Sequence, residues 1–380
     1  MKQNGVLIKT ENQLCLKNKE GQKMKKLIIS ILAAISLVAC SEEKSDKPVV
    51  KIGVMLPLSG EMAEFGKNSQ YAVEFAVQDH KDSPIKFKIV FEDDMFTSSK
   101  AAVIANKFVN VDKVNAVVST FSHVGSAVSP ITNKAKVLHI SLSNAANIAE
   151  GDLNFTNWQL VDVATKKMAD YLVSQKSKKV VSFNMQSVGN EEVRVNTNKF
   201  LDKNKIKYKE FFFVPEDRDF ALIIQKAKSF DADYWILNSF SPALEIIRKE
   251  MLANDVNIPV INVQNMGITK NPELFENQVF IGAPDGNENF ISRMAKKTKS
   301  KVLNIPAYAY DTVNLIMVAN EDFYAKNGRI PNGNELAETL KKTKFYDGVV
   351  GKLEVQDNGV IKSPSVVKKF VNGEQVIIKE

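Results

Sequence analysis

The chain has 380 residues, a formal net charge of +7 and two cysteines. Residues 1–39 carry seven Lys and two Glu, so the part from Cys40 onward is nearly balanced, with 44 basic and 42 acidic residues. This balance argues against nucleic-acid binding, because nucleic-acid-binding proteins concentrate basic residues on one face. No cysteine follows Cys40, and the three histidines, His80, His123 and His139, form no close pair in the sequence, so we expect no disulfide, no metal site and no cofactor.

An apolar stretch near the N-terminus, MKKLIISILAAISLVACSEEK, begins at Met24. Lys25 and Lys26 precede 13 uncharged residues, 27–39, and the chain becomes polar directly after Cys40. Thirteen residues are too few to span a bilayer, which takes about 20, but they fit the apolar core of a signal peptide. The stretch therefore predicts export.

The residues Leu-Val-Ala-Cys that end at Cys40 resemble the lipobox of bacterial lipoproteins. The resemblance implies that residues 24–39 are a signal peptide and that Cys40 is lipidated, anchoring an exported protein to a membrane on the periplasmic or outer face of the envelope. Residues 1–23 are polar and fit no leader, so we interpret them as an over-extended start, and residues 40–50 as a linker. The alternative is an ordinary secretory signal with a chance cysteine at its cleavage site.

From residue 50 onward, short runs rich in β-branched residues alternate with amphipathic segments of helical length. Strands are predicted at 50–58, 86–94, 114–120, 137–143, 178–185, 209–214, 234–240 and 259–264. Helices are predicted at 63–80, 99–110, 124–135, 165–176, 190–204, 218–230, 242–254, 307–325 and 334–344. Two hairpins follow, over 351–362 with a turn at Asp357-Asn358-Gly359 and over 367–379 with a turn at Asn372-Gly373.

Strands that alternate with helices in this way indicate βαβ units and parallel sheets. Two such series in about 330 residues predict an α/β protein of two doubly wound parallel-sheet lobes, which would bind a ligand at the carboxyl ends of the strands.

Catalytic motifs are missing from the sequence: it contains no Gly-x-Gly-x-x-Gly after the first strand, no P-loop and no Gly-x-Ser-x-Gly elbow. The acidic run at 92–94 is interpreted as a strand end with solvated or capping carboxylates, because no complementary His or Glu motif accompanies it. The sequence therefore favours binding over catalysis. An exported α/β enzyme that uses a cleft acid such as Asp94 or Asp162 stays as the alternative.

The segment IGVMLPLSGEMAEFGKNSQYAVEFAVQD resembles the opening strand and helix of the leucine/isoleucine/valine-binding type of ABC-transporter solute-binding protein. Further similar segments follow in the same order, FEDDMFTSSKAAVIANKFV, NAVVSTFSHVGSAVSP, VLHISLSNAAN, AYAYDTVNLIMVA and YDGVVGKLEVQDNGV. The resemblance implies the type I periplasmic-binding-protein fold, two lobes joined by three crossovers near 158–163, 283–287 and 346–351. Lobe 1 would then comprise 51–160 and 286–347, and lobe 2 would comprise 161–285 and 348–380.

The resemblance also implies where a ligand is held in lobe 1. The serine that binds a ligand carboxylate matches Ser122, and the residues after the fourth strand match Ser143, Asn144 and Ala145, with Ala145 in place of the usual hydroxyl. An aromatic that flanks the ligand matches Phe65. The positions of a disulfide found in some members match Phe96 and Phe121, which we expect to form a hydrophobic clasp; Phe121 is also expected at the ligand.

Lobe 2 departs further from the amino-acid-binding members. The resemblance matches the ligand-binding tyrosine of those members to Val188 and their second aromatic residue to Phe240. It matches the acidic residue that receives the ligand ammonium to Gln264. A buried ammonium without a carboxylate is costly, so a carboxylate, amide or other neutral ligand fits better. Asp162 could still supply the charge, although a hinge or capping role suits it better.

These expectations combine into a monomeric, lipid-anchored protein that captures a small molecule, passes it to an ABC permease and catalyses no reaction. Two alternatives share the fold: a ligand-sensing or envelope-assembly binding protein without transport, and branched-chain amino-acid binding proper.

Overall fold

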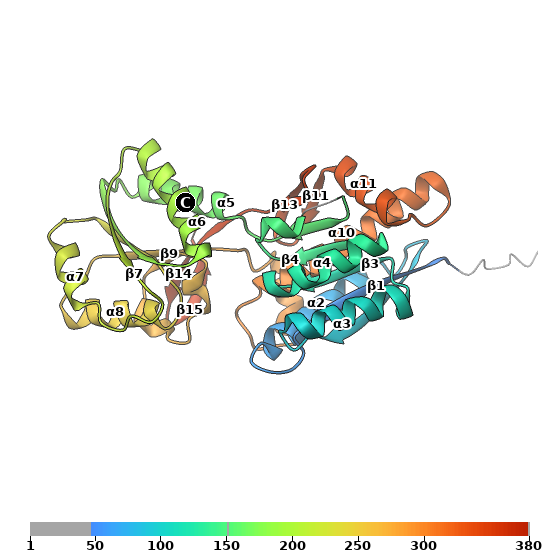
Figure 1. Ribbon diagram of the computed structural model, residues 1–380, viewed down its shortest axis with the longest axis horizontal. Coiled ribbons are helices and arrows are strands. Elements are labelled where there is room, and N and C mark those ends of the chain that lie inside the picture. Colours follow the sequence, from blue (N-terminus) through green and yellow to red (C-terminus); the bar gives the residue numbers. More distant parts are fainter. Residues whose placement is uncertain (1–46, 150–151, 379–380) are drawn as a thin grey trace, which may run out of the picture. The chain divides into compact units, whose positions relative to one another are not determined.

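The computed structural model describes residues 47–149 and 152–378, which form two β-sheets with helices on both faces of each (Figure 1). The expected start, signal peptide and lipidated Cys40, with most of the linker, lie outside the described residues. Within the described ranges, no helix has the length and apolar character needed to cross a membrane.

The first sheet has eight strands in the order β11-β12-β13-β5-β4-β3-β1-β2. Its strands are β1 (Val49–Leu56), β2 (Lys86–Asp93), β3 (Ala116–Thr120), β4 (Leu138–Leu142), β5 (Asn154–Asn157), β11 (Phe345–Gly348), β12 (Gly351–Val355) and β13 (Val360–Lys362). The strands from β13 to β2 pair in parallel, whereas β11, β12 and β13 pair antiparallel. β3 and β4 are buried along their whole length, as expected for parallel strands covered on both faces.

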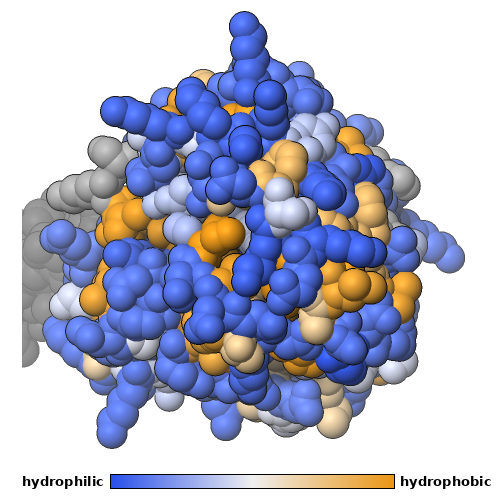
Figure 2. Space-filling view, turned by 90° about the vertical axis from the view of Figure 1, so that its left-hand side faces the viewer, coloured by the Kyte–Doolittle hydropathy of each residue, from blue (hydrophilic) through white to orange (hydrophobic). Residues whose placement is uncertain are grey.

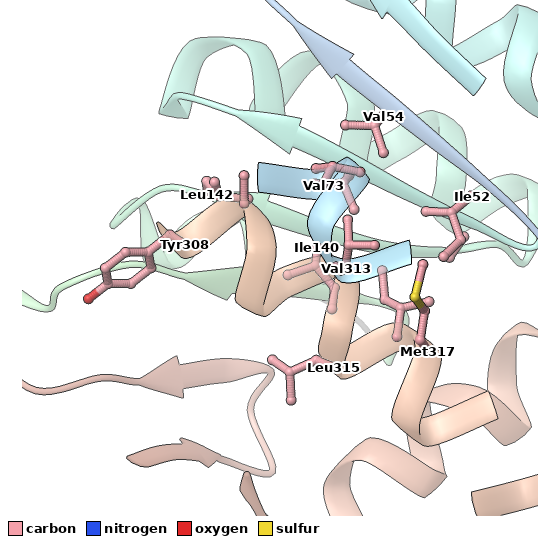
Figure 3. Packing of buried hydrophobic residues seen from close by; sticks show 14 of the residues in the cluster. Ile52, Val54, Val73, Ile140, Leu142, Tyr308, Val313, Leu315 and Met317 are labelled. Atoms are coloured by element: carbon pink, nitrogen blue, oxygen red, sulfur yellow. The ribbon is translucent and has the colours of Figure 1, made fainter. Parts of the chain in front are cut away.

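Side chains of β1 alternate between two cores. Ile52 and Val54 face a core shared with α2 (Ala63–Asp79) and α10 (Asn304–Asn327), which Figure 3 shows with Val73 and Val313. Met55 faces the opposite core, shared with α3 (Ser98–Lys107) and α4 (Ser122–Ala135). Successive side chains of a strand point to opposite faces of the sheet, so β1 contributes to the packing of a helical layer on each face. α9 (Glu288–Ala295) and α11 (Gly333–Thr343) also contribute to the first core, and the short helices η1 (Phe108–Asp112) and η2 (Ala146–Ala149) complete this lobe.

The second sheet has seven strands in the order β15-β14-β10-β9-β8-β6-β7. Its strands are β6 (Lys179–Met185), β7 (Lys207–Phe213), β8 (Tyr234–Asn238), β9 (Val260–Val263), β10 (Val279–Gly282), β14 (Val366–Val371) and β15 (Glu374–Ile377). One face packs on α5 (Val161–Ser174) and α6 (Val188–Lys203), and the other on α7 (Ala221–Lys228) and α8 (Ala243–Ala253). The short helices η3 (Asn265–Ile268) and η4 (Pro272–Phe275) follow β9. The face that includes α7 and α8 is mainly hydrophilic, with separate apolar areas (Figure 2).

The two-lobed α/β architecture agrees with the sequence prediction, except that both sheets are mixed, because the C-terminal hairpins pair antiparallel. Both predicted hairpin turns are confirmed: β12 pairs with β13, and β14 with β15, where Asn372 and Gly373 have φ of 53° and 74°. Positive φ at both positions is what a two-residue hairpin turn requires.

The third crossover predicted at 346–351 is wrong. Those residues form β11 and its turn into β12, and the chain reaches the second sheet only between Lys362 and Val366. The cause is Asp311 on α10, whose carboxylate accepts the backbone N–H groups of Val349 (2.7 Å) and Val350 (3.0 Å). This contact holds the turn against α10, so the hairpin extends the first sheet. The chain changes sheet earlier between Asn157 and Val161, and between Gly282 and Glu288.

Gly66, in the first turn of α2, has no room for a side chain, since a Cβ there would lie 2.0 Å from the carbonyl oxygen of Pro57. Gly66→Ala is expected to lower the free energy of unfolding by about 1–3 kcal/mol, despite the better helix propensity of alanine. Gly189→Ala on α6 is the control, because nothing lies within 4 Å of its added Cβ. In urea unfolding, Gly189→Ala should be as stable as the wild type or more stable. Equal losses of stability in Gly66→Ala and Gly189→Ala would contradict the prediction.

Candidate functional site

A pocket of about 140 Å³ lies at the carboxyl ends of β3 and β4. Its walls come from the loops after β3, β4 and β5 and from the start of α10: Thr120, Phe121, Ser122, Leu142, Ser143, Asn144, Trp158 and Ile305. Parallel sheets bind ligands at this edge. Of the predicted site residues, the pocket brings together Phe121, Ser122, Ser143 and Asn144.

Two hydroxyl groups in this pocket are buried without a hydrogen-bonding partner. The Oγ1 of Thr120 and the Oγ of Ser143 form no hydrogen bond within the described part of the chain, and the two residues are 1% and 4% exposed. Most buried polar groups in proteins are paired, so these two hydroxyls are available for a partner supplied from outside the chain. Ser122 begins α4, whose first N–H groups favour an anion or a carbonyl oxygen.

Trp158 and Ile305 were not predicted, although both line the pocket. The ring of Trp158 packs on Tyr308 with 4.6 Å between centroids, which fixes it as a wall. Trp158 directly follows β5, so recognition of that strand would have placed it at the carboxyl edge of the sheet.

Phe65 and Ala145 do not line the pocket. Phe65 lies in α2 and Ala145 precedes η2, where its carbonyl accepts the N–H of Ile148. The three predicted positions of the second lobe are also separate from this pocket: Val188 begins α6, Phe240 follows β8 and is 42% exposed, and Gln264 follows β9.

The expected clasp between Phe96 and Phe121 is confirmed, since their ring centroids lie 4.8 Å apart at an interplanar angle of 89°. His123 reinforces it through a 3.0 Å hydrogen bond between its Nε2 and the carbonyl oxygen of Phe96. Met95, Phe96 and Phe121 all have positive φ, between 51° and 66°. Strained backbone of this kind concentrates at ligand-binding sites, and the clasp holds the strained loops together beside the pocket.

In the acidic run at 92–94, Asp93 and Asp94 have different environments. Asp93 caps loops by accepting the N–H groups of Leu58 (2.9 Å) and Met95 (3.0 Å). Asp94 is fully buried, and this burial raises its pKa to about 6 although the Phe96 N–H donates to its Oδ1. The predicted capping role thus holds, but Asp94 is not solvated.

Ser119, His139 and Asn154 form a hydrogen-bonded row across β3, β4 and β5. His139 contacts Ser119 Oγ at 2.8 Å through Nε2 and Asn154 Oδ1 at 3.0 Å through Nδ1. The order resembles a nucleophile, a base and an orienting amide, but the three residues are at most 1% exposed, so no substrate reaches them. The row therefore acts as a polar link between strands.

Burial lowers the pKa of His139 from 6.5 to about 4, with the Asn154 hydrogen bond opposing the shift. Between these values the unfolded chain binds a proton that the folded chain excludes, so stability falls as the pH falls from 6.5 to 4, by about 3 kcal/mol. His139→Gln should remove this part of the pH dependence in denaturant unfolding at pH 7 and pH 4.5, whereas His123→Gln, at an exposed histidine, should keep it. An unchanged pH dependence in His139→Gln would refute the assignment.

Comparisons with known proteins agree with this architecture. Residues 49–368 match the family model described as periplasmic binding protein. The Leu/Ile/Val-binding protein homolog 3 of Brucella melitensis is 24% identical over 362 residues, covering 90% of this chain and 95% of that protein.

Two solved structures show the fold. A branched-chain amino acid transporter substrate-binding protein of Streptococcus pneumoniae, in complex with isoleucine, has a TM-score of 0.68 and 21% identity, covering 87% of this chain and 100% of that one. A solute-binding protein of an ABC transporter of Rhodopseudomonas palustris, in complex with 3,4-dihydroxybenzoic acid, has a TM-score of 0.67 and 16% identity, covering 87% and 96%. The predicted fold class is confirmed, and the chain belongs to the periplasmic binding protein family.

Proposed function

We propose that the chain is an extracytoplasmic solute-binding lipoprotein, which captures a small carboxylate- or amide-bearing molecule between its two lobes and delivers it to an ABC permease. The observation that carries the proposal is the pocket at the ends of β3 and β4, with two buried, unpaired hydroxyls beside a helix start. These groups suit the oxygen atoms of a carboxylate or an amide.

The pocket walls suggest the rest of the ligand. Phe121, Leu142, Trp158 and Ile305 provide an apolar and partly aromatic lining, and no carboxylate is among the lining residues. An ammonium group held against these residues would lack a counter-charge, which is unfavourable. The Rhodopseudomonas palustris protein, whose ligand is an aromatic acid without an amine, shows that this fold accommodates such a molecule.

Anchoring and transport complete the proposal. Lipidation of Cys40 would tether the two lobes to the membrane through a short linker, close to permease subunits, and the protein would act as a monomer. The lobes proposed are 51–160 with 286–362, and 161–285 with 363–380, after the correction of the third crossover.

Branched-chain amino-acid binding is the second candidate, favoured by the names of the Brucella melitensis and Streptococcus pneumoniae proteins. Both relatives are less than 25% identical to this chain, and the two candidates differ in whether the ligand amine contributes to binding.

A ligand panel tests the proposal on the full chain. Thermal-shift screening followed by calorimetry would compare amino acids, their amides and carboxylic acids of the same carbon skeleton. We expect acids or amides without an ammonium group to bind most tightly. Tight binding of leucine that depends fully on its α-amino group would support the second candidate and contradict the first.

A further inference from the structure

The amino ends of four neighbouring strands form one edge of the first sheet. The strands β4, β3, β1 and β2 pair in parallel, so their amino ends lie together along what we call the amino edge. At a spacing of about 4.8 Å between strands, the four ends span roughly 15 Å. The N–H of Lys86, the first residue of β2, donates to the carbonyl oxygen of Pro48 at 2.8 Å. The chain therefore enters the first sheet at the amino edge.

Exposed lysines gather at the amino edge. Four of them form no ion pair within the described part of the chain: Lys86, Lys113, Lys134 and Lys136. Acidic groups offset this charge only in part. Asp82 is exposed in the loop before β2, but Asp112 forms a 2.8 Å ion pair with Lys107, and Asp152, before β5, lies 3.9 Å from Nζ of Lys341. The amino edge therefore carries a net positive charge.

The opposite edge of the same strands, which holds the pocket, has a different charge. The loops after β1, β2 and β4, residues 57–62, 94–97 and 143–145, contain no Lys or Arg. They contain two acidic residues, Glu61 and the buried Asp94. The positive charge at the strand ends of lobe 1 is thus concentrated at the amino edge, away from the pocket.

The proposed lipid anchor is close to the amino edge along the chain. Cys40 precedes Pro48 by eight residues, and eight residues span at most about 28 Å. A lipid on Cys40 would therefore keep the amino edge within that distance of the membrane. Residues 41–46 carry three acidic residues and one lysine, so the linker itself adds no attraction to an anionic surface.

We propose that the amino edge of the first sheet docks on anionic lipid headgroups of the membrane that carries the anchor, with the pocket turned away from that membrane. The inference rests on the proposed function, from which it takes the lipid on Cys40. Each lysine at an anionic lipid surface raises affinity about fivefold, and the attraction falls off over about 8 Å at physiological ionic strength. The tether supplies the proximity, and the lysines supply the orientation.

Lysine labelling of the full chain, purified from membranes with its anchor, tests the orientation. The chain would be reconstituted on vesicles of phosphatidylcholine alone or with one third phosphatidylglycerol, treated with an amine-reactive reagent and analysed by mass spectrometry. The four lysines of the amino edge should react at least about threefold more slowly on the anionic vesicles. This protection should disappear in 1 M NaCl, where the screening length falls to about 3 Å.

The second sheet provides matched controls within the same chain. Its strands β6 and β7 also have four exposed lysines without ion pairs at their amino ends: Lys176, Lys178, Lys205 and Lys207. These lysines have no nearby anchor along the chain, so their labelling should be the same on both kinds of vesicle. Equal protection of both sets would show general adsorption and would overturn the proposed orientation.

A pair of double variants tests whether the lysines cause the docking. Lys113→Gln/Lys136→Gln should abolish most of the protection of Lys86, because about two fivefold contributions are lost. Lys205→Gln/Lys207→Gln removes the same charge from the second sheet and should leave Lys86 protected. Undiminished protection of Lys86 in the first double variant would contradict a docking that depends on these lysines.

The outcomes separate this inference from the proposed function. A chain that neutral vesicles do not retain lacks the anchor, which would count against the lipoprotein assignment and overturn the docking with it. A retained chain whose amino-edge lysines react equally on both kinds of vesicle would overturn the docking alone. In that case the ligand panel would still decide what the two lobes bind.

Discussion

Replacing Asp285 with alanine should lower the free energy of unfolding by about 3–5 kcal/mol. Asp285 lies between β10 and α9, and its Oδ2 pairs at 2.5 Å with Nζ of Lys368 on β14. The Lys368 side chain is only 1% exposed. The variant would therefore leave an ammonium buried without a partner, which is much less favourable than losing the pair as a whole.

Replacing Lys368, the other member of the ion pair, should lower the free energy of unfolding by less. The Asp285 side chain is 12% exposed and borders a surface groove of about 600 Å³, so water can reach an unpaired carboxylate there more easily than an unpaired Lys368. Lys368→Met should therefore cost less than Asp285→Ala. The double variant should recover much of the loss, because an apolar pair often replaces a buried ion pair with little change in stability.

Asp285→Asn separates charge from hydrogen bonding, because the Oδ1 of Asp285 also accepts the N–H of Leu303, at 3.1 Å, and an asparagine keeps that acceptor. Urea unfolding of the four variants at pH 7 would check the argument, with Asp285→Ala expected to lose the most stability and the double variant to regain much of that loss. A loss below about 1 kcal/mol in Asp285→Ala would show that the pair contributes little.

The lobes and hairpins could be predicted because their signals are local. Alternating apolar runs define strands and helices, and Asn372-Gly373 carries the turn chemistry that its hairpin needs. The third crossover could not be found in this way. It depends on Asp311 binding two N–H groups that lie 38 and 39 residues further along the chain, a contact that no periodicity reveals.

Some residues of the pocket could likewise be predicted from local sequence signals, and others could not. Ser122, Ser143 and Asn144 could be predicted because they lie within two residues of the ends of strands with clear apolar patterns. Trp158 was missed because β5 before it reads Asn-Phe-Thr-Asn, which lacks such a pattern. The sequence predicts Gln264 as a site position, but its hydrogen-bonding partner Gln159 is 105 residues away, so their contact appears only in the folded chain.

The double variant Thr120→Val/Ser143→Ala should weaken binding of the tightest carboxylate ligand by roughly 10²–10⁴-fold. Each hydroxyl can donate one hydrogen bond to a charged carboxylate, and such a bond contributes about 1.5–3 kcal/mol. The free chain should not lose stability, because Thr120 Oγ1 and Ser143 Oγ form no hydrogen bond within the described residues. A binding loss without a stability loss is what distinguishes a ligand contact from a structural residue.

Ser126→Ala is the matched control, since Ser126 is exposed on α4, one turn beyond Ser122, and is not among the residues that line the pocket. Calorimetry should give this control the wild-type affinity, and thermal unfolding should place the melting temperatures of all three chains close together. If the double variant binds as tightly as the control, the carboxylate is not held at the ends of β3 and β4. If the double variant melts well below the control, the two hydroxyls support the fold, and their lack of partners no longer indicates a binding site.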